Sequence, residues 1–581
     1  MICVTTYRLS CSAVVRPPQA RMSSSNRLSH PADVANVTST SVGSRLRIIA
    51  RLRANIGPFV LVVAFLGLWE LLARTVFAGR FLVPPPETVF WGIWRDRGVY
   101  QYAVPTTVHE AALGFLWGNV AAILVALLFL LAPVTEKLGM RLAIVSYCLP
   151  VVAIAPILQI VLTGESPKIG LATISVFFTT LIIVLTGLRS ADPVSLDLIR
   201  VYGGGSFKIL RKVRIPTALP HLFRALQLAA PTALLGAIIG EFLGGTQGLG
   251  IAMIVAQADL NVTLMWGLIV VSSCIAGLCY AVIGLAGRRL TRWSVEAGTS
   301  AGSASMGAIP ATASAVPGGP GGAISRLRRV AGSTVMPVLS VVFALAVWDL
   351  SLKVFGLSSY VAKGPLDVWD YLFSGSMASQ NRSPILSALW TTLRDAGFGL
   401  IAGCVIGCLL AFIVVLVPRI ETYVLGWGIT LRVLPLAAVA PLIGAVFGRG
   451  VVAAIIVCAM ISFFPTFVLM VGGLNSATPG SIALIRSYGG GRWKTMRKVR
   501  IPSSLPALFA ALKIAAPAAL TGALVTEWTV TGNGMGALVI VASNESLFGQ
   551  IWASIVIIAV VSILLFSLAG LGERLSASHG Y

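Results

Sequence analysis

Long apolar stretches limit this chain to few folds. Runs of about 20 mainly apolar residues, the length of a membrane-spanning helix, recur from residue 58 to residue 572. A backbone that crosses lipid must satisfy its own amide and carbonyl groups, and an α-helix does so within one segment. Only 11% of the residues are charged and 57% are hydrophobic, whereas soluble proteins carry roughly 25% charged residues. The sequence therefore predicts an all-α polytopic membrane protein.

The hydrophobic pattern predicts about twelve spanning helices, six in each half of the chain. In the first half they cover residues 58–77, 105–132, 142–163, 168–188, 222–243 and 264–287. In the second half they cover residues 334–355, 390–417, 423–447, 450–472, 508–529 and 550–572.

The two halves repeat one another. Tyr202–Pro231 aligns without gaps to Tyr488–Pro517 at a shift of 286 residues, and 20 of the 30 positions are identical. "LPVVAIAP" at Leu149 likewise matches "LPLAAVAP" at Leu434. Six spans in each half give both repeats the same direction, so we predict two parallel six-helix repeats related by an axis along the membrane normal.

Composition sets the expected domain boundaries. Residues 1–44 are rich in Ser, Thr, Arg and Pro and are predicted to form a disordered tail, with Met22 as an alternative start of the chain. The repeats are predicted at 45–293 and 326–581. Between them, residues 294–325 are rich in Gly, Ala, Ser and Pro and are predicted to form a flexible linker.

The net charge of +23 is concentrated in short clusters next to the predicted spans. Lys and Arg collect in cytoplasmic loops of membrane proteins, and the loop 244–263 on the opposite side has neither residue. Both termini and the linker are therefore expected in the cytoplasm. These charges indicate topology in a lipid bilayer and not binding to nucleic acid. The cysteines form no CxxC and the histidines have no ligand spacing, so no metal site is predicted.

The most similar segments of the two repeats are basic loops after the fourth span, at 190–220 and 476–506. Each has three glycines, then a basic amphipathic stretch, then I-P-x-x-L-P. The glycines predict a sharp turn, and the first proline of each loop predicts the end of the second stretch. We therefore predict a cytoplasmic helix–turn–helix elbow in each half, with the later proline opening the next span. A basic loop that only sets topology would not keep this spacing twice, so the elbows are predicted to dock into a groove on a partner.

The residues of these elbows are the main candidates for function. In the first copy they are Tyr202, Gly203, Gly204, Gly205, Lys208, Arg211, Arg214, Pro216 and Pro220. In the second copy they are Tyr488, Gly489, Gly490, Gly491, Lys494, Arg497, Arg500, Pro502 and Pro506.

This pattern resembles the cytoplasmic "EAA" loop of permeases from binding-protein-dependent ABC importers. The distance from Gly204 to the following Ile-Pro equals that from Gly490. "FLVPPPETV" at Phe81 and "GEFLGG" around Glu241 are similar to the branch that moves nitrate, taurine, aliphatic sulfonates and pyrimidine precursors of thiamine. Where the family has an acidic residue before the glycine, the first copy has Asp197, which joins the candidate residues, whereas the second copy has alanine.

The resemblance implies a type I ABC importer permease-like fold in a bacterial plasma membrane. It also implies that the elbows are coupling helices seated on two cytoplasmic ATPase subunits, and that a solute-binding protein delivers the solute outside. ATP and Mg would bind to the ATPase and no cofactor to this chain. The sequence agrees, because it contains no GK dipeptide and hence no phosphate-binding loop, so the chain is predicted not to be an enzyme.

Polar residues and prolines recur at matching places inside the spans. Glu241 and Glu527 lie near the ends of the fifth spans, and a charge at a helix centre costs roughly 2.5–3.5 kcal/mol. Each is either a structural lock or pathway element, or an interfacial glutamate paired with loop amides or water. Glu110, with its counterpart Asp395, is interpreted as structural. The prolines of the third spans predict bending along a central path; they are Pro150, Pro156, Pro435 and Pro441.

Two other classes of protein compete with this interpretation. A twelve-helix secondary transporter driven by an ion gradient also has parallel repeats, but it should have buried acids and bases along its path and a long basic loop after the second span. The corresponding loop here, "APVTEKLGMR", is short. An uncoupled membrane scaffold or channel would not need two matched elbows.

Overall fold

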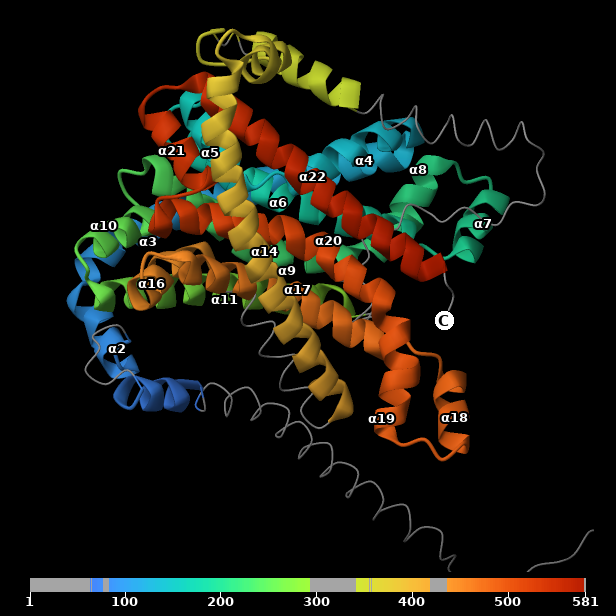
Figure 1. Cartoon of the computed structure of the whole chain (residues 1–581). Coiled ribbons are helices and arrows are strands. Elements are labelled where there is room, and N and C mark those ends of the chain that lie inside the picture. The colour runs from blue at the N-terminus through green and yellow to red at the C-terminus, as the bar shows by residue number, and fades with distance from the viewer. Residues whose placement is uncertain are drawn as a thin grey trace, which may run out of the picture. The chain divides into compact units, whose positions relative to one another are not determined.

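The computed structural model describes residues 63, 65–76, 83–292, 341–354, 356, 358–417 and 436–578. Every regular element in these ranges is a helix (Figure 1), which confirms the predicted all-α class. The chain divides into two compact units, and all of the described residues belong to the second unit, Val63–Tyr581. The predicted tail 1–44 and linker 294–325 lie outside the described residues.

The helices occur in the same order in both halves. The first half contains α2 (Pro86–Arg95), α3 (Arg97–Leu131), α4 (Pro133–Cys148), α5 (Val151–Val161), α6 (Ser166–Arg189), α7 (Pro193–Val201), α8 (Ser206–Ile209), the π-helix η1 (Leu210–Arg214), α9 (Ile215–Gly244), α10 (Leu249–Ala258) and α11 (Val262–Leu290). The second half contains α13 (Pro365–Trp369), η3 (Asp370–Ser374), α14 (Ala378–Leu416), α16 (Leu436–Phe447), α17 (Val451–Asn475), α18 (Pro479–Ser487), α19 (Arg492–Thr495), η4 (Met496–Arg500), α20 (Ile501–Thr526), η5 (Glu527–Thr531), α21 (Met535–Asn544) and α22 (Phe548–Ser578).

Eight helices in the described part of the chain are long and apolar enough to cross a membrane, or nine if α4 and α5 together form one bent span. Three of the twelve predicted spans, 58–77, 334–355 and 423–447, lie partly outside the described residues. Their described parts are helical at 65–74, at 341–354 and in α16. The polytopic helical architecture is thus established, and the count of twelve spans stays a prediction.

The third predicted span is not one straight helix. The axes of α4 and α5 meet at 97°. Leu149 between them is extended, with φ −70° and ψ 116°, because a residue before proline disfavours the helical region, and Pro150 has no amide to continue the helix. The prediction of bending in this span is therefore correct at Pro150, and the prediction of a single helix over 142–163 is wrong. Pro156 lies inside α5, and Pro441 lies inside α16, its counterpart in the second repeat.

The short helices α5 and α16 each contact both halves of the chain. α5 of the first half packs against α20, α21 and α22 of the second half. α16 of the second half packs in turn against α9, α10 and α11 of the first half. We call this reciprocal contact the seam. It lies within the largest cluster of buried apolar side chains, to which both halves contribute.

Small residues bring the long helices close together. Along α14, Gly399, Gly403 and Gly407 lie four residues apart and face α17. A Cβ added to Gly403 would lie 2.5 Å from the carbonyl oxygen of Ala459. The opposite face of the same helix exposes large apolar side chains such as Ile401. Small residues between helices and large apolar ones outside are the pattern of helices packed in lipid.

This packing predicts opposite outcomes for two glycines of α14. Gly403→Ala should lower the thermal unfolding temperature of the detergent-solubilised chain, because the new methyl group overpacks the contact with α17 and costs about 1–3 kcal/mol. Gly397→Ala is the matched control, since a Cβ at Gly397 meets no atom within 4 Å and alanine favours the helix. Equal unfolding temperatures for the two variants would contradict the close α14–α17 packing.

Candidate functional site

Each predicted elbow is a short helix followed by a glycine turn. In the first elbow the side chain of Asp192 accepts hydrogen bonds from the first-turn amides of α7. After α7, Gly203 has φ +70°, its N–H donates to the Arg200 carbonyl (2.9 Å), and the N–H of Gly204 donates to the Ile199 carbonyl (2.8 Å). This is a Schellman termination, in which a glycine with positive φ closes the helix.

The three glycines of the turn have different physical roles. Gly203 provides the positive φ. A Cβ at Gly204 would lie 2.4 Å from Cγ2 and 2.7 Å from the carbonyl oxygen of Ile199, so this position has no room for a side chain. Gly205 faces open space and has ordinary extended angles, with φ −74°. The turn therefore needs glycine at the first two positions only.

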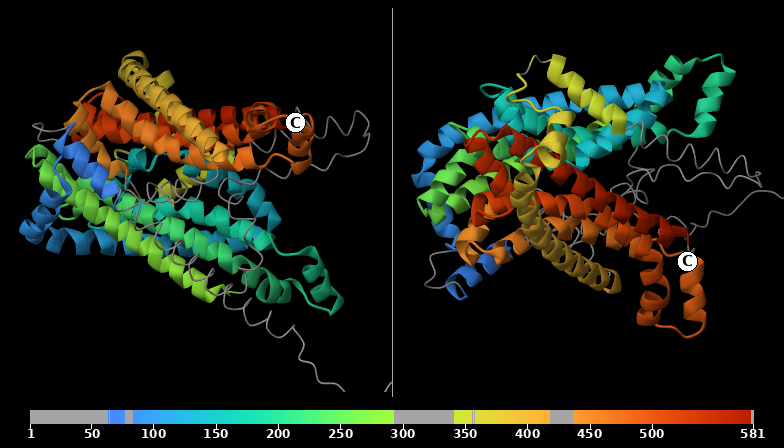
Figure 2. Two further views of the ribbon diagram at one scale, coloured as in Figure 1. Left: turned by 90° about the horizontal axis from the view of Figure 1, so that it is seen from below. Right: turned by 45° about the horizontal axis from the view of Figure 1, so that its top comes forward.

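The second elbow reproduces this geometry. Gly489 has φ +72°, and the N–H of Gly490 donates to the Ile485 carbonyl at 2.9 Å. A Cβ at Gly490 would lie 2.4 Å from Cγ2 of Ile485, while Gly491 faces open space. Both elbows extend beyond the ends of the long helices on the same side in each view (Figures 1 and 2). The predicted helix–turn–helix shape is therefore observed in both copies.

The prolines of the elbows do not act as predicted. Ser206–Gly244 is one helix of 39 residues, and Arg492–Thr531 is one of 40, so Pro216 and Pro502 do not end a stretch, and Pro220 and Pro506 lie inside helices and do not open them. Each first proline is the second residue after a π-helical turn, η1 or η4. The π-turn shifts the backbone hydrogen bonds of the helix by one residue. The amide that proline lacks therefore falls where the backbone hydrogen-bonding pattern already changes.

The outer surface of each elbow combines positive charge with exposed apolar groups. Lys208, Arg211, Lys494 and Arg497 are exposed, whereas Arg214 and Arg500 are partly buried. Asp197 forms an exposed ion pair with Arg200 at 2.9 Å. Matching large side chains are exposed in both copies; they are Leu198, Tyr202 and Phe207 in the first and Leu484, Tyr488 and Trp493 in the second. Exposed apolar groups gathered on one feature are typical of contact sites.

At its other end, the helix that starts in the first elbow carries Glu241, which is fully buried. Thr107 on α3 donates its hydroxyl to Glu241 Oε1 at 2.5 Å, and the N–H of Gly250 donates to Oε2 at 2.6 Å. The Thr107 hydroxyl also accepts from the N–H of Leu249 at 2.8 Å. Two otherwise unpaired amides at the start of α10 are thereby satisfied. We call this set of contacts the first clasp.

The second half builds the same clasp. Thr392 on α14 donates its hydroxyl to Glu527 Oε2 at 2.9 Å, and the N–H of Gly536 donates to that oxygen at 2.9 Å. The N–H of Met535 donates to the Thr392 hydroxyl at 2.9 Å. Glu527 is fully buried. Both glutamates therefore pair with amides, as one alternative expected, but in the protein interior and not at an interface. This geometry favours the structural-lock interpretation.

The two clasps differ in charge. In the first, Lys168 lies 2.7 Å from Glu110, and both side chains are almost completely buried beside Glu241. In the second, Ala454 replaces Lys168 at the 286-residue shift, and Asp395 pairs with its neighbour Arg394 at 2.9 Å.

The residue that packs against Lys168 also differs between the halves. A Cβ on Gly240 would lie 2.8 Å from Cα of Lys168. At the 286-residue shift the equivalents of Gly240 and Lys168 are Thr526 and the small Ala454. A buried lysine that pairs with the acidic residue after the clasp threonine region, Lys168 with Glu110, is thus found in the first half and is replaced by Ala454 in the second.

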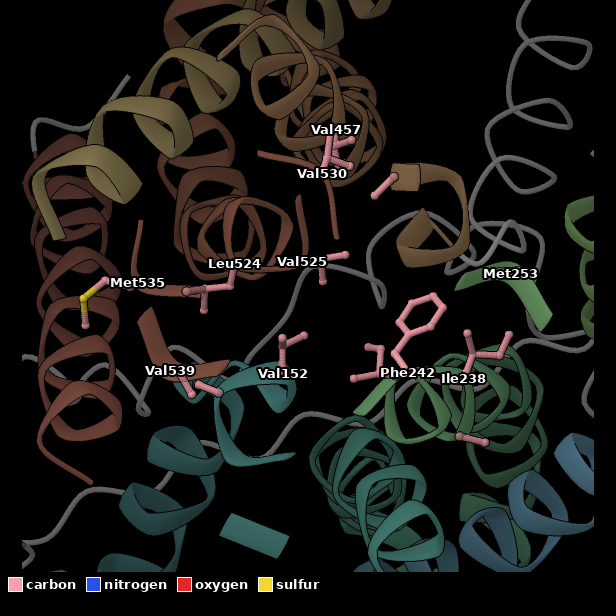
Figure 3. Packing of buried hydrophobic residues seen from close by; sticks show 14 of the residues in the cluster. Val152, Ile238, Phe242, Met253, Val457, Leu524, Val525, Val530, Met535 and Val539 are labelled. Atoms are coloured by element: carbon pink, nitrogen blue, oxygen red, sulfur yellow. The ribbon is translucent and has the colours of Figure 1, made fainter. Parts of the chain in front are cut away.

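A small, partly open apolar pocket lies in the seam. Its lining includes Val152 and Pro156 of α5, Leu243 of α9, Leu524 of α20, Trp528 of η5 and Val539 of α21. Figure 3 shows Val152 and Phe242 of the first half facing Leu524 and Val525 of the second half. The structure therefore places Pro156 at the central contact between the halves, whereas Pro435 lies outside the described residues.

Comparison with known proteins identifies the family. The family model described as binding-protein-dependent transport system inner membrane component matches this chain twice, at residues 118–296 and 399–577. The chain belongs to this family. The permease is duplicated within one polypeptide, with one match in each half of the chain.

Relatives of this permease are about one repeat long. A probable ABC transporter permease protein of Haemophilus influenzae is 28% identical over 239 residues, which cover 41% of this chain and 97% of the relative. A formylaminopyrimidine transport permease protein of Halalkalibacterium halodurans is 27% identical over 195 residues, covering 33% and 78%. A putative aliphatic sulfonates transport permease protein of Bacillus subtilis is 25% identical over 239 residues, covering 40% and 86%.

Membership of this family decides between the competing classes. The chain is the membrane component of a bacterial ABC importer, a multi-pass membrane protein without an ATPase domain, and it works with an ATPase and a solute-binding protein. ATP binds to the partner ATPase and not to the permease. The ion-driven transporter and the uncoupled channel are thereby excluded.

Several residues of the clasps and the seam escape prediction from the sequence. Thr107 and Thr392 lie in a segment that matches between the repeats, but a threonine in a helix is usually bonded to its own backbone. The sequence does not predict Lys168 as the partner of Glu110, because no repeat pattern connects the two residues. Phe242 and Trp528 directly follow the two glutamates, and that shared position was the available signal.

The buried ion pair predicts a rescue experiment. Lys168→Met keeps the apolar stem but leaves the Glu110 carboxylate unpaired in the interior, which should destabilise the protein by about 3–5 kcal/mol and lower the thermal unfolding temperature. Adding Glu110→Gln should restore most of the loss, because the second change removes the unpaired charge. An unfolding temperature that falls further in the double variant would contradict a direct Lys168–Glu110 pairing.

Proposed function

We propose that this permease imports a small solute through the seam, and that two ATPase subunits drive it by docking onto the two elbows. The observation that carries this proposal is the repetition of one elbow geometry in both halves. The repetition includes the two glycines that each turn requires. The elbows present matching exposed aromatic residues and positive charge. A short amphipathic helix of this kind fits a groove on a partner protein.

The long helices provide the mechanical connection. The helix Ser206–Gly244 begins at the first elbow and carries the clasp glutamate near its end, and Arg492–Thr531 does the same in the second half. Such a helix is about 60 Å long at 1.5 Å per residue. Movement of an elbow therefore reaches the clasp and the seam through one rigid element. ATP can shift the permease only if the closed ATPase pair binds one conformation more tightly than the other.

The orientation follows from charge. The basic elbows are assigned to the cytoplasm, together with both termini, and the clasps then lie toward the outer surface. Twelve spans as two parallel six-helix repeats, at 45–293 and 326–581, complete the proposed topology. We assign the solute to the nitrate, sulfonate, taurine and pyrimidine-precursor group, in keeping with the names of the formylaminopyrimidine and aliphatic sulfonate relatives.

The elbow glycines predict a selective loss of ATPase binding. Gly204→Ala together with Gly490→Ala should reduce capture of the ATPase by the tagged permease by at least about tenfold, because the Cβ atoms disrupt both Schellman turns. Gly205→Ala with Gly491→Ala is the matched control and should retain capture, since a Cβ at either position meets no atom within 4 Å. Co-purification from membranes measures both. Undiminished capture by the first variant would refute docking at the elbows.

A further inference from the structure

The two halves meet at an aromatic pair next to the clasps. Phe242 and Trp528 are equivalent residues at the 286-residue shift, and each directly follows a clasp glutamate. Their rings contact one another across the seam, edge to face, with centroids 5.9 Å apart and an interplanar angle of 89°. Phe242 is buried and points toward the centre of the seam in Figure 3. The contact therefore closes the seam at the level of the clasps.

The surroundings hold this contact in place. Glu241 and Glu527 fix the backbone directly before each ring through buried hydrogen bonds. Across the seam, the Gln257 side-chain amide of α10 donates to the Thr529 carbonyl of η5 at 2.9 Å. Trp528 lies in that π-helical turn, and π-turns are frequent at functional sites.

The residues beside Trp528 indicate which kind of solute could contact the pair. Trp528 lines the seam pocket, and none of the described residues that line it carries a charge. An anion such as nitrate or a sulfonate would lose its hydration there without gaining a partner, which is costly. A flat aromatic ring would instead replace the Phe242–Trp528 contact with a ring–Trp528 contact of the same kind.

We propose that Phe242 and Trp528 form the gate of the seam, and that Trp528 binds a planar aromatic heterocycle as it passes. This inference rests on the proposed function, since it takes the seam as the solute path. It narrows the solute to the pyrimidine type and excludes aliphatic sulfonates and nitrate as preferred solutes. Phe242 acts as the movable half of the gate, and Trp528 is the specificity-determining residue.

The gate is tested by leakage through the full-length permease in liposomes. Phe242→Ala should increase erythritol-driven swelling, followed by light scattering, by about tenfold over the wild type, because the aromatic closure is lost. Phe467→Ala is the matched control. It removes the same side chain from a fully buried cluster outside the seam and should leave swelling unchanged. Phe242→Leu is the second variant if Phe242→Ala does not fold. An intact barrier in folded Phe242 variants, or equal leakage in the control, would overturn the gate.

Recognition of an aromatic ring by Trp528 is tested with the same liposome-swelling measurement. Formylaminopyrimidine should block swelling of Phe242→Ala liposomes, and taurine at equal concentration should not. The block should disappear in Phe242→Ala with Trp528→Ala, since the stacking surface is gone. Block by taurine alone, or a block that persists without Trp528, would overturn the ring assignment. ATPase capture is measured separately, so a permease that captures its ATPase and never leaks disproves only this inference.

Discussion

A buried carboxylate that receives the first amides of a short helix organises each half of this permease. Glu241 and Glu527 have no access to solvent, and an unpaired charge in such a place would be strongly destabilising. Each is stabilised by a threonine hydroxyl and a glycine amide. Gly248 and Gly534, with φ +124° and +97°, let the chain turn closely around the carboxylates. The clasps thereby fix three helices in each half and determine where the seam lies.

The two ends of each long helix differ in their chemistry. The elbow end is exposed, basic and aromatic, and it continues into the helix through a π-turn that tolerates proline. The clasp end is buried, and hydrogen bonds to the clasp glutamate hold it in place. If the elbow is the proposed docking surface, a stiff helix between it and the clasp can transmit force, whereas a flexible loop at the same place would absorb it. Glycines of these helices pack closely against their neighbours, Gly236 and Gly240 of α9 against α6 and Gly522 of α20 against α17, and closely packed helices resist bending.

The helical class, the duplication and the elbows could be predicted from the sequence because they depend on local signals. Apolar length, repeated spacing and glycine chemistry are visible in any window of the chain. The sequence did not predict that the helices continue through Pro216 and Pro502, since a π-turn has no distinct amino-acid composition. The contacts of α5 and α16 with the opposite half and the pairing of Lys168 with Glu110 were not predicted either. These depend on contacts between residues far apart in the chain, for which a single sequence has no signal.

The contacts of α5 and α16 with the opposite half bear on how the polypeptide is made. Ribosomes deliver the first half to the membrane well before α20, α21 and α22 exist, so one surface of α5 stays without its final neighbours through synthesis of more than half the chain. Two separately encoded copies would have to find each other by diffusion to cover that surface. Covalent linkage guarantees that the missing neighbours arrive, in the right number and from the right direction.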